Sequence, residues 1–329
     1  MAGPFCLLAG RFGFTTLSER GSVMMSERAK GVAAMIGACS IWGLSPIYYK
    51  LLSHVSALEV LSHRMIWSLV IFAMLLALQG RLREIARSMN TMRSFGLVVV
   101  AALMIAANWT LFIWSVQTGQ TTQTSLGYYI YPLVAVVIGR LIFGEQLTAL
   151  QWLAVAMATV AVALLTFGPG VAPWIALTLA ATFGVYGLIK KQLNVGPVVS
   201  VTGEVLLLTP FAVIILLQTY HNGGAVFGGD LQTMVLLVFA GPITASPLIL
   251  FSYAARRLAM TSLGLLQYIN PTLQFACAVF VFSEPFGLWH LIAFSLIWSA
   301  LALYSAASLR LESTRRKAAR AAEASGTTI

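Results

Sequence analysis

The sequence predicts an all-α membrane protein with ten transmembrane helices in two inverted five-helix repeats. Composition is the first reason. Of 329 residues, 59% are hydrophobic and only 9% are charged, and the mean hydropathy of +0.87 is too high for the surface of a soluble domain. The second reason is a series of apolar stretches long enough to cross a bilayer. The third is a set of motifs that occurs twice.

Ten apolar stretches of roughly 20 residues, the length that crosses about 30 Å of hydrocarbon, follow one another along the chain. They lie at about 31–51, 57–79, 94–116, 124–143, 149–168, 171–189, 200–219, 231–253, 262–283 and 288–308. Each is a solid apolar run and not an alternating one, which argues against a barrel. Helices are then the structure that satisfies every backbone group in lipid.

Lysine and arginine predict the orientation of these helices. They cluster before the first stretch, after the second, fourth, sixth and eighth, and behind the tenth, whereas the opposite loops hold at most Lys50. Positive residues mark the cytoplasmic side, so both termini are expected in the cytoplasm. The net charge of +10 is therefore explained by topology, and a basic folded face for nucleic acid is absent.

The repeat is visible in the fourth and ninth stretches. TSLG precedes Tyr129-Ile130-Tyr131-Pro132 and again precedes Tyr268-Ile269-Asn270-Pro271, and the order F-x-E follows at Phe143 to Glu145 and at Phe282 to Glu284. Each half holds five stretches, an odd number, so the second half must cross the membrane in the opposite sense, as in many secondary transporters.

The repeat also sets the expected boundaries. They are an N-terminal cytoplasmic segment at 1–30, a first repeat at 31–168, a second and inverted repeat at 171–309 joined through Gly168-Pro169-Gly170, and a basic cytoplasmic tail at 310–329. The tail is rich in charge and alanine, and we expect it to be a mobile strip.

Inverted repeats place a substrate site near the midplane, where the two halves meet. Polar and aromatic residues deep in the apolar stretches are therefore candidates for substrate contact. The candidates for substrate binding are Asn108, Trp109, Tyr128, Gln267, Tyr268 and Asn270. Core packing remains the alternative for each of them.

Four ionisable residues in the spans are candidate proton or ion-pair sites, because a charge at the centre of a transmembrane helix costs about 2.5 to 3.5 kcal/mol. They are Glu59, His63, Arg64 and Glu204. Glu59 and His63 are four residues apart on one helix face, so they can pair directly. Snorkelling toward water or a structural ion pair stays open for all four.

Two further pairs follow from the repeat. Pro132 and Pro271 each remove a backbone hydrogen bond inside a span, and we expect them to act as matched hinges, with simple kinks as the alternative. Glu145 and Glu284 come just before the fifth and tenth stretches. We expect their carboxylates to complement the dipoles of those two helices.

Several classes of protein are disfavoured. Cys6, Cys39 and Cys277 show neither disulfide nor metal-ligand spacing, the phosphate-binding loop of ATPases is absent, and no cluster for catalysis is apparent. We therefore expect no metal, no cofactor and no enzyme activity. The expected partners are a small-molecule substrate and membrane lipids. A homodimer is an option, although ten spans can bury their own polar groups.

Longer motifs add a family resemblance. Ile41-Trp42-Gly43-Leu44-Ser45-Pro46, Glu59-x-x-x-His63-Arg64, Asn108-Trp109 and Gln267-Tyr268-Ile269-x-Pro271-Thr272 resemble the RarD proteins, EamA-like members of the drug/metabolite transporter superfamily, in register from about 31 to 308. The resemblance implies a carrier of the bacterial inner membrane and a chloramphenicol-type substrate. This chain departs from the family at Gln123, where relatives tend to have an acidic residue, and at Tyr131, where they tend to have asparagine.

Taken together, these features predict a secondary transporter that exports a small amphipathic drug or metabolite by alternating access. An amino-acid exporter and a flippase for a lipid-linked substrate are the alternatives, and an intramembrane enzyme is a remote one. Proton antiport is a further hypothesis that rests on Glu59, His63 and Glu204.

Overall fold

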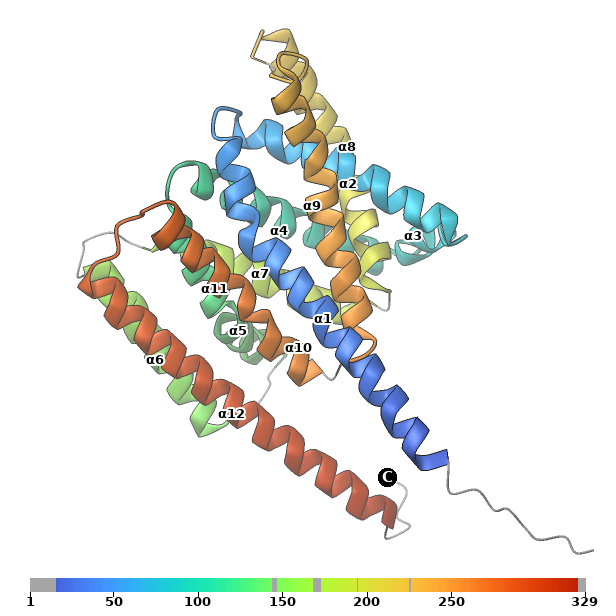
Figure 1. Ribbon diagram of the computed structural model, residues 1–329, viewed down its shortest axis with the longest axis vertical. Coiled ribbons are helices and arrows are strands. Elements are labelled where there is room, and N and C mark those ends of the chain that lie inside the picture. The colour runs from blue at the N-terminus through green and yellow to red at the C-terminus, as the bar shows by residue number, and fades with distance from the viewer. Residues whose placement is uncertain are drawn as a thin grey trace, which may run out of the picture.

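The computed structural model describes residues 16–143, 147–167, 173–193, 195–224, 226–258 and 260–324. Within these ranges the chain folds into helices joined by short turns, and no strand is present (Figure 1). The elements are α1 (Thr16–Leu51), α2 (Ala57–Leu78), α3 (Arg83–Ser88), α4 (Met92–Gln117), α5 (Thr121–Phe143), α6 (Ala149–Phe167), α7 (Trp174–Gln192), α8 (Pro197–His221), α9 (Leu231–Ala255), α10 (Met260–Gln267), α11 (Ile269–Ala276), the π-helical η1 (Cys277–Val281) and α12 (Leu288–Ala324).

The prediction of an all-α membrane protein is confirmed. Seven helical segments in the described ranges are long and apolar enough to cross a membrane, and they lie in α1, α2, α4, α6, α8, α9 and α12. A shorter apolar helix covers Trp174–Lys190, while α5 and the α10–α11–η1 series cover the fourth and ninth predicted stretches. Ten crossings and two inverted repeats remain a prediction.

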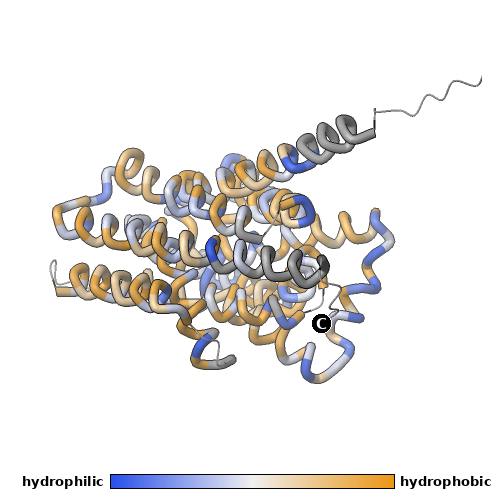
Figure 2. The backbone as a smooth tube through the Cα atoms, turned by 90° about the horizontal axis from the view of Figure 1, so that it is seen from below, coloured by the Kyte–Doolittle hydropathy of each residue, from blue (hydrophilic) through white to orange (hydrophobic). Residues whose placement is uncertain are grey.

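The outer surface suits hydrocarbon. Phe211, Leu217 and Val235 are each more than half exposed, while Glu204 is fully buried and Arg64 is 6% exposed. A protein in water shows the reverse pattern. Figure 2 agrees, since apolar residues run along the helices and hydrophilic residues gather toward turns and helix ends.

The helices form a bundle with one flanking pair. α2 packs against α8 and α9, α1 against α9 and α11, and α5 against α7 and α11, while α6 and α12 pack on each other. Figure 1 shows α6 and α12 side by side along one flank. Tyr129 of α5 holds this pair through edge-on contacts with Phe294 and Trp298 of α12. The flanking pair therefore forms a separate wall beside α5.

The predicted ends of the first and last helices were too short. α1 begins at Thr16, although the part suited to a membrane begins at Glu27. α12 continues past residue 310 to Ala324, so this part of the predicted tail is helical. Alanine, arginine and glutamate are strong helix formers, which explains why the helix does not stop where the apolar stretch does.

The two predicted hinge prolines differ in their local structure. α5 continues through Pro132, whereas the ninth stretch breaks at Tyr268, between α10 and α11. Pro271 has no N–H to donate to the carbonyl of Gln267 four residues earlier, and a helix is weakened at such a point. The break therefore coincides with the bond that Pro271 cannot make.

Glu284 caps a different helix from the one predicted. Its carboxylate accepts hydrogen bonds from the Thr121 and Thr122 backbone N–H groups, both at 2.7 Å, and from Thr122 Oγ1 at 2.8 Å. It thus complements the N-terminus of α5, while α12 begins four residues later at Leu288. Its predicted counterpart Glu145 and the junction at residues 168–170 lie outside the described residues.

Replacing Glu284 with alanine is expected to lower the free energy of unfolding by about 2 kcal/mol, because the substitution leaves two N–H groups at a helix end without an acceptor. Unfolding in a denaturing detergent, followed by circular dichroism, would measure this change. Asp230→Ala is the matched control. Asp230 caps α9 through the Thr233 N–H at 2.9 Å but is exposed to solvent, so its loss should have a smaller effect. An equal effect of both substitutions would contradict the buried cap.

Candidate functional site

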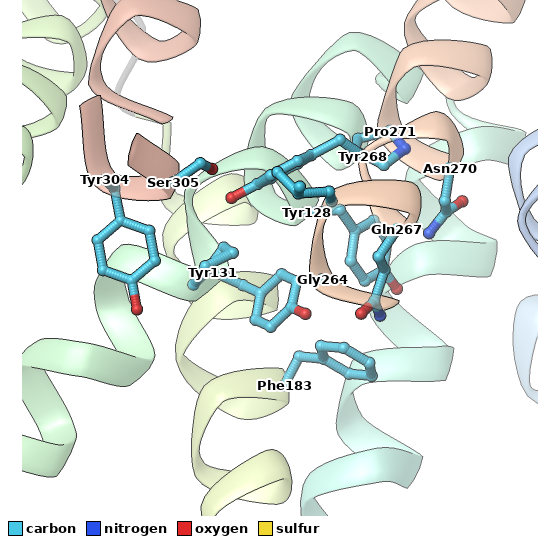
Figure 3. Close-up of a pocket in the computed structure, with 12 residues that line it drawn as sticks. Tyr128, Tyr131, Phe183, Gly264, Gln267, Tyr268, Asn270, Pro271, Tyr304 and Ser305 are labelled. Atoms are coloured by element: carbon cyan, nitrogen blue, oxygen red, sulfur yellow. The ribbon is translucent and has the colours of Figure 1, made fainter. Parts of the chain in front are cut away.

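A cavity of about 310 Å³ lies between α5, α7, the α10–α11 break and α12. Its wall is built from aromatic and amide side chains together with two prolines and a glycine. The lining residues are Tyr128, Tyr131, Pro132, Phe183, Gly264, Leu265, Gln267, Tyr268, Asn270, Pro271, Tyr304 and Ser305. Figure 3 shows Tyr131, Phe183 and Gln267 turned toward one space, with Tyr304 across from them on α12.

Local helix geometry explains how α5 and α10 shape this wall. Tyr128, Tyr131 and Pro132 are spaced by three and four residues, so they share one face of α5. On the facing element, Gly264 contributes no side chain, and a Cβ atom placed there would meet nothing within 4 Å. The absence of a side chain at Gly264 therefore leaves part of the cavity open.

Four of the six predicted substrate-binding residues line this cavity: Tyr128, Gln267, Tyr268 and Asn270. Asn108 does not, but it positions one of them. Its amide accepts a hydrogen bond from the Tyr128 hydroxyl at 2.9 Å and donates to the Leu179 carbonyl and to Thr182 Oγ1, both at 3.0 Å. Asn108 is therefore a positioning residue behind the wall.

Trp109 is likewise absent from the lining. It is 9% exposed, and the Arg64 guanidinium lies over its ring, with Cζ 3.9 Å from the ring centroid. A helix places neighbouring residues about 100° apart, so Asn108 and Trp109 point to different neighbours. Neither of the two lines the cavity, and the sequence alone could not show that both lie behind its wall.

Several cavity residues were not among the predicted candidates. Phe183 packs edge-on against Tyr128 and Tyr131, with ring centroids 5.7 and 5.0 Å apart. Tyr131 could have been inferred from its position three residues after Tyr128. Tyr304 and Ser305 lie near the end of their apolar stretch, where tyrosine usually indicates the membrane interface.

The pairing of Glu59 with His63 that the spacing allows is not formed. Glu59 Oε1 accepts a hydrogen bond from the Val226 N–H at 3.0 Å, and the His63 ring stacks on Phe227 with centroids 4.6 Å apart. Both side chains therefore contact the segment between α8 and α9, and no ion pair joins Glu59 to His63 within the described ranges. The four-residue spacing places Glu59 and His63 on one face of α2, but it could not show that the segment with Val226 and Phe227 covers that face.

Glu204 forms a buried ion pair. Its Oε1 lies 2.6 Å from Lys190 Nζ on α7, and its carboxylate also accepts hydrogen bonds from Ser200 Oγ at 2.8 Å and Tyr186 Oη at 3.0 Å. Every partner is within one or two turns of the α7–α8 connection. The geometry is that of a structural ion pair, one of the two roles proposed for Glu204 from the sequence.

Polar contacts join the helix ends on the side of the bundle away from Tyr304. The Glu284 cap is one of these contacts. In another, the Gln117 amide donates to the carbonyls of Leu52 and Val55 at 2.8 and 3.0 Å. His54 Nε2 lies 3.0 Å from Thr233 Oγ1. A smaller hollow of about 210 Å³ lies on that side, between the start of α5 and His290 of α12.

Buried polar groups, an apolar exterior and an aromatic cavity define an integral membrane protein, and comparison with known proteins assigns it to the transporters. Residues 29–167 match the EamA-like transporter family. The chain is 40% identical to the protein RarD of Streptomyces exfoliatus over 92% of this chain and 96% of that relative. It therefore belongs to the RarD family of EamA-like transporters.

Two further comparisons concern a more distant relative and a solved structure. The chain is 29% identical to a protein of Pseudomonas aeruginosa named chloramphenicol-sensitive protein RarD, over 87% of this chain and 97% of that protein. A solved crystal structure matches the fold with a TM-score of 0.57 and 15% identity, over 84% of this chain and 97% of that structure. The second likeness concerns the fold alone.

Proposed function

We propose that this protein is a secondary transporter that exports a small amphipathic drug or metabolite of chloramphenicol type across the bacterial inner membrane. The observation that carries the proposal is the chemistry of the cavity. Among the described residues, none that lines it is charged, and its walls combine aromatic rings with the amides of Gln267 and Asn270. Such a wall suits an uncharged aromatic molecule with a few hydrogen-bonding groups.

The packing of the helices supports two inverted five-helix repeats. The proposed repeats pair the helices in order: α1 with α7, α2 with α8, α4 with α9, α5 with the α10–α11–η1 series, and α6 with α12. With this assignment, most of the extensive helix contacts in one half have an equivalent contact in the other. α5 on α7 corresponds to α11 on α1, α1 on α9 to α7 on α4, and α2 on α9 to α8 on α4. The pairs α2–α8, α5–α11 and α6–α12 map onto themselves. This is the pattern that a two-fold relation between the halves requires.

Alternating access then follows from the position of the cavity. It lies beside the pair α5 and α11, which are equivalent under the proposed symmetry, and toward the end of α12 that holds Tyr304. At the opposite end, the contacts of Glu284, Gln117 and His54 hold the helices together. If the two halves exchanged conformations, the helix ends near Glu284 would separate and the end near Tyr304 would close. The same site would then open to the other side of the membrane. If both termini are cytoplasmic, the end of α12 that holds Tyr304, and with it the cavity, lies toward the cytoplasm.

Two alternatives stay in view. α12 forms one wall of the cavity through Tyr304 and Ser305, and α12 belongs to the flanking pair, so movement of this pair would open the site toward lipid, as a flippase needs. An amino-acid exporter would need groups that bind a carboxylate and an ammonium.

Proton coupling through Glu59 and His63 is a further proposal. Uptake into inverted vesicles that survives an uncoupler would refute it.

Gly264→Phe provides the test of the proposed site. A Cβ at residue 264 would meet nothing within 4 Å, so a phenyl ring there should occupy part of the cavity and abolish ligand binding while the protein still folds. Stabilisation against heat would be measured in the purified protein with amphenicols, amino acids and lipid precursors. Saturation at about 100 times Kd stabilises by about 2.7 kcal/mol.

Gly187→Phe is the matched control. Gly187 is an exposed helical glycine of α7, and a Cβ there also meets nothing within 4 Å. We expect wild type and Gly187→Phe to be stabilised by an amphenicol and Gly264→Phe not to be. Stabilisation of Gly264→Phe equal to that of wild type would refute the site, and a response to lipid precursors alone would favour the flippase.

A further inference from the structure

Arg64 of α2 is a buried cation with an unusual set of neighbours. It is 6% exposed, and its guanidinium lies between aromatic rings, with Cζ 3.9 Å from the centroid of Trp109 and 5.8 Å from that of Tyr49. These rings belong to α4 and α1. Arg64 therefore lies where three helices meet and does not reach toward water.

Within the described residues, the charge of Arg64 has no anionic partner. The ion pairs in the described part of the chain use Lys30, Arg81, Lys190 and Arg257 as cations, so no carboxylate there comes within 4.0 Å of Arg64. Its Nε is enclosed and makes no hydrogen bond. Two more enclosed nitrogens nearby on α2, Nε2 of His63 and Nε1 of Trp67, are also without a partner.

This arrangement is costly unless an anion arrives. A guanidinium removed from water loses hydration that only a paired anion or several hydrogen bonds can replace, and contacts with aromatic rings replace only part of it. The Lys190 ammonium has the Glu204 carboxylate and the Ser200 hydroxyl as hydrogen-bond partners, whereas Arg64 has no carboxylate partner among the described residues. The missing component is a single negative charge with oxygen acceptors.

The aromatic residues around Arg64 connect it to the cavity. Tyr49 packs edge-on against Phe112 at 5.7 Å, and Phe112 packs edge-on against Tyr128, a wall residue of the cavity, at 5.9 Å. The hydroxyl of that same Tyr128 is held by Asn108, the residue before Trp109. The guanidinium would reach the cavity through a rearrangement of these rings, Tyr49, Phe112 and Tyr128, which lie in series between Arg64 and the cavity wall.

We infer that Arg64 is the anion-binding group of the transport pathway and that it accepts the carboxylate of an amphipathic substrate whose aromatic or apolar body occupies the cavity. The planar guanidinium donates two parallel hydrogen bonds to a carboxylate, and one unpaired cation matches one negative charge. This inference rests on the proposed transport function and adds organic monoanions to the uncharged aromatic molecules proposed above as a substrate class. The competing explanation is a purely structural cation that joins α1, α2 and α4.

The test uses the full-length protein in lipid nanodiscs with 3-phenylpropionate as the probe and its neutral isostere 3-phenylpropanamide beside it. Binding is read from thermal stabilisation and from quenching of tryptophan fluorescence, since Trp109 lies under Arg64. Wild type should bind the carboxylate at least tenfold more tightly than the amide. Arg64→Gln should remove this difference and keep the affinity for the amide, while Arg64→Lys should retain part of it.

Arg93→Gln is the matched control, because Arg93 is an exposed arginine in the first turn of α4, and it should behave as wild type. Equal binding of the carboxylate by wild type and Arg64→Gln would overturn the inference, as would equal stabilisation by sodium chloride or sodium sulfate. If Arg64→Gln fails to fold, the ratio of carboxylate to amide affinity in wild type and Arg64→Lys decides the question, and a ratio near one overturns the inference. Binding of chloramphenicol that Gly264→Phe abolishes, without any preference for the carboxylate, would leave the proposed function standing and refute the role of Arg64.

Discussion

Lys190→Met is expected to lower the free energy of unfolding by about 3 to 5 kcal/mol, the usual cost of breaking a buried ion pair by removing one partner. Glu204 is fully buried, and Lys190 Nζ is the one cation within 4.0 Å of its carboxylate among the described residues. Ser200 and Tyr186 would still donate hydrogen bonds, but they cannot neutralise the charge. Unfolding in a denaturing detergent would measure the loss.

Two comparisons separate the ion pair from a general effect of losing a lysine. Lys50→Met removes a lysine at the end of α1. Among the described residues, its Nζ reaches only the Gln117 carbonyl at 3.5 Å and the Phe282 ring, so the substitution should cost under about 1 kcal/mol. The double variant Lys190→Met with Glu204→Leu should regain most of the stability, because it removes the unpaired charge. A Lys190→Met protein as stable as Lys50→Met would contradict the buried pair.

Gly43→Ala is the second substitution expected to have a large effect. A Cβ at residue 43 would lie 2.6 Å from Leu273 Cβ and 2.9 Å from the Asn270 carbonyl oxygen, so α1 and α11 would have to separate. Overpacking of this kind costs about 1 to 3 kcal/mol. Because Asn270 lines the cavity, we also expect a loss of ligand binding, measured as loss of thermal stabilisation by an amphenicol.

Gly37→Ala is the matched control on the same helix. A Cβ there would lie 3.5 Å from Leu250 Cδ1, an ordinary van der Waals distance, and alanine favours a helix over glycine by about 0.5 to 1 kcal/mol. We expect Gly37→Ala to be neutral or slightly stabilising and to bind as wild type does. If Gly43→Ala behaved in the same way, the close approach of α1 and α11 would be wrong.

Much of the fold could be predicted from the sequence, because the signal for a span is local. A solid apolar run of the right length is enough to expect a helix in lipid, and helices lie over every stretch that was predicted. The end of α12 could not be predicted in this way, since hydropathy ends at the edge of the apolar run while helix propensity continues through the alanine-rich residues beyond it.

The site was predictable in part, for a related reason. Tyr128, Gln267, Tyr268 and Asn270 could be predicted to line a cavity because they lie deep in apolar stretches. Polar side chains in lipid need hydrogen-bond partners, and a cavity can provide them. Depth could not distinguish the wall from the layer behind it, so Asn108 was assigned to the wall.

Contacts between distant segments were the hardest part to predict. Glu59 bonds to Val226 and Glu284 to the start of α5, and both pairs join segments more than 160 residues apart. Helical spacing identifies neighbours on one helix, but it carries no information about which loop covers them. Both carboxylates could therefore be recognised as structurally important while their partners were misassigned.

The central claim is that the cavity bounded by Gly264 is the substrate site of a transporter. Counterflow of labelled chloramphenicol in proteoliposomes tests it most directly, with wild type, Gly264→Phe and Gly187→Phe reconstituted at equal amounts. We predict that wild-type and Gly187→Phe vesicles loaded with unlabelled chloramphenicol accumulate the label, and that Gly264→Phe vesicles do no better than empty liposomes. Accumulation by Gly264→Phe equal to that of wild type would contradict the claim.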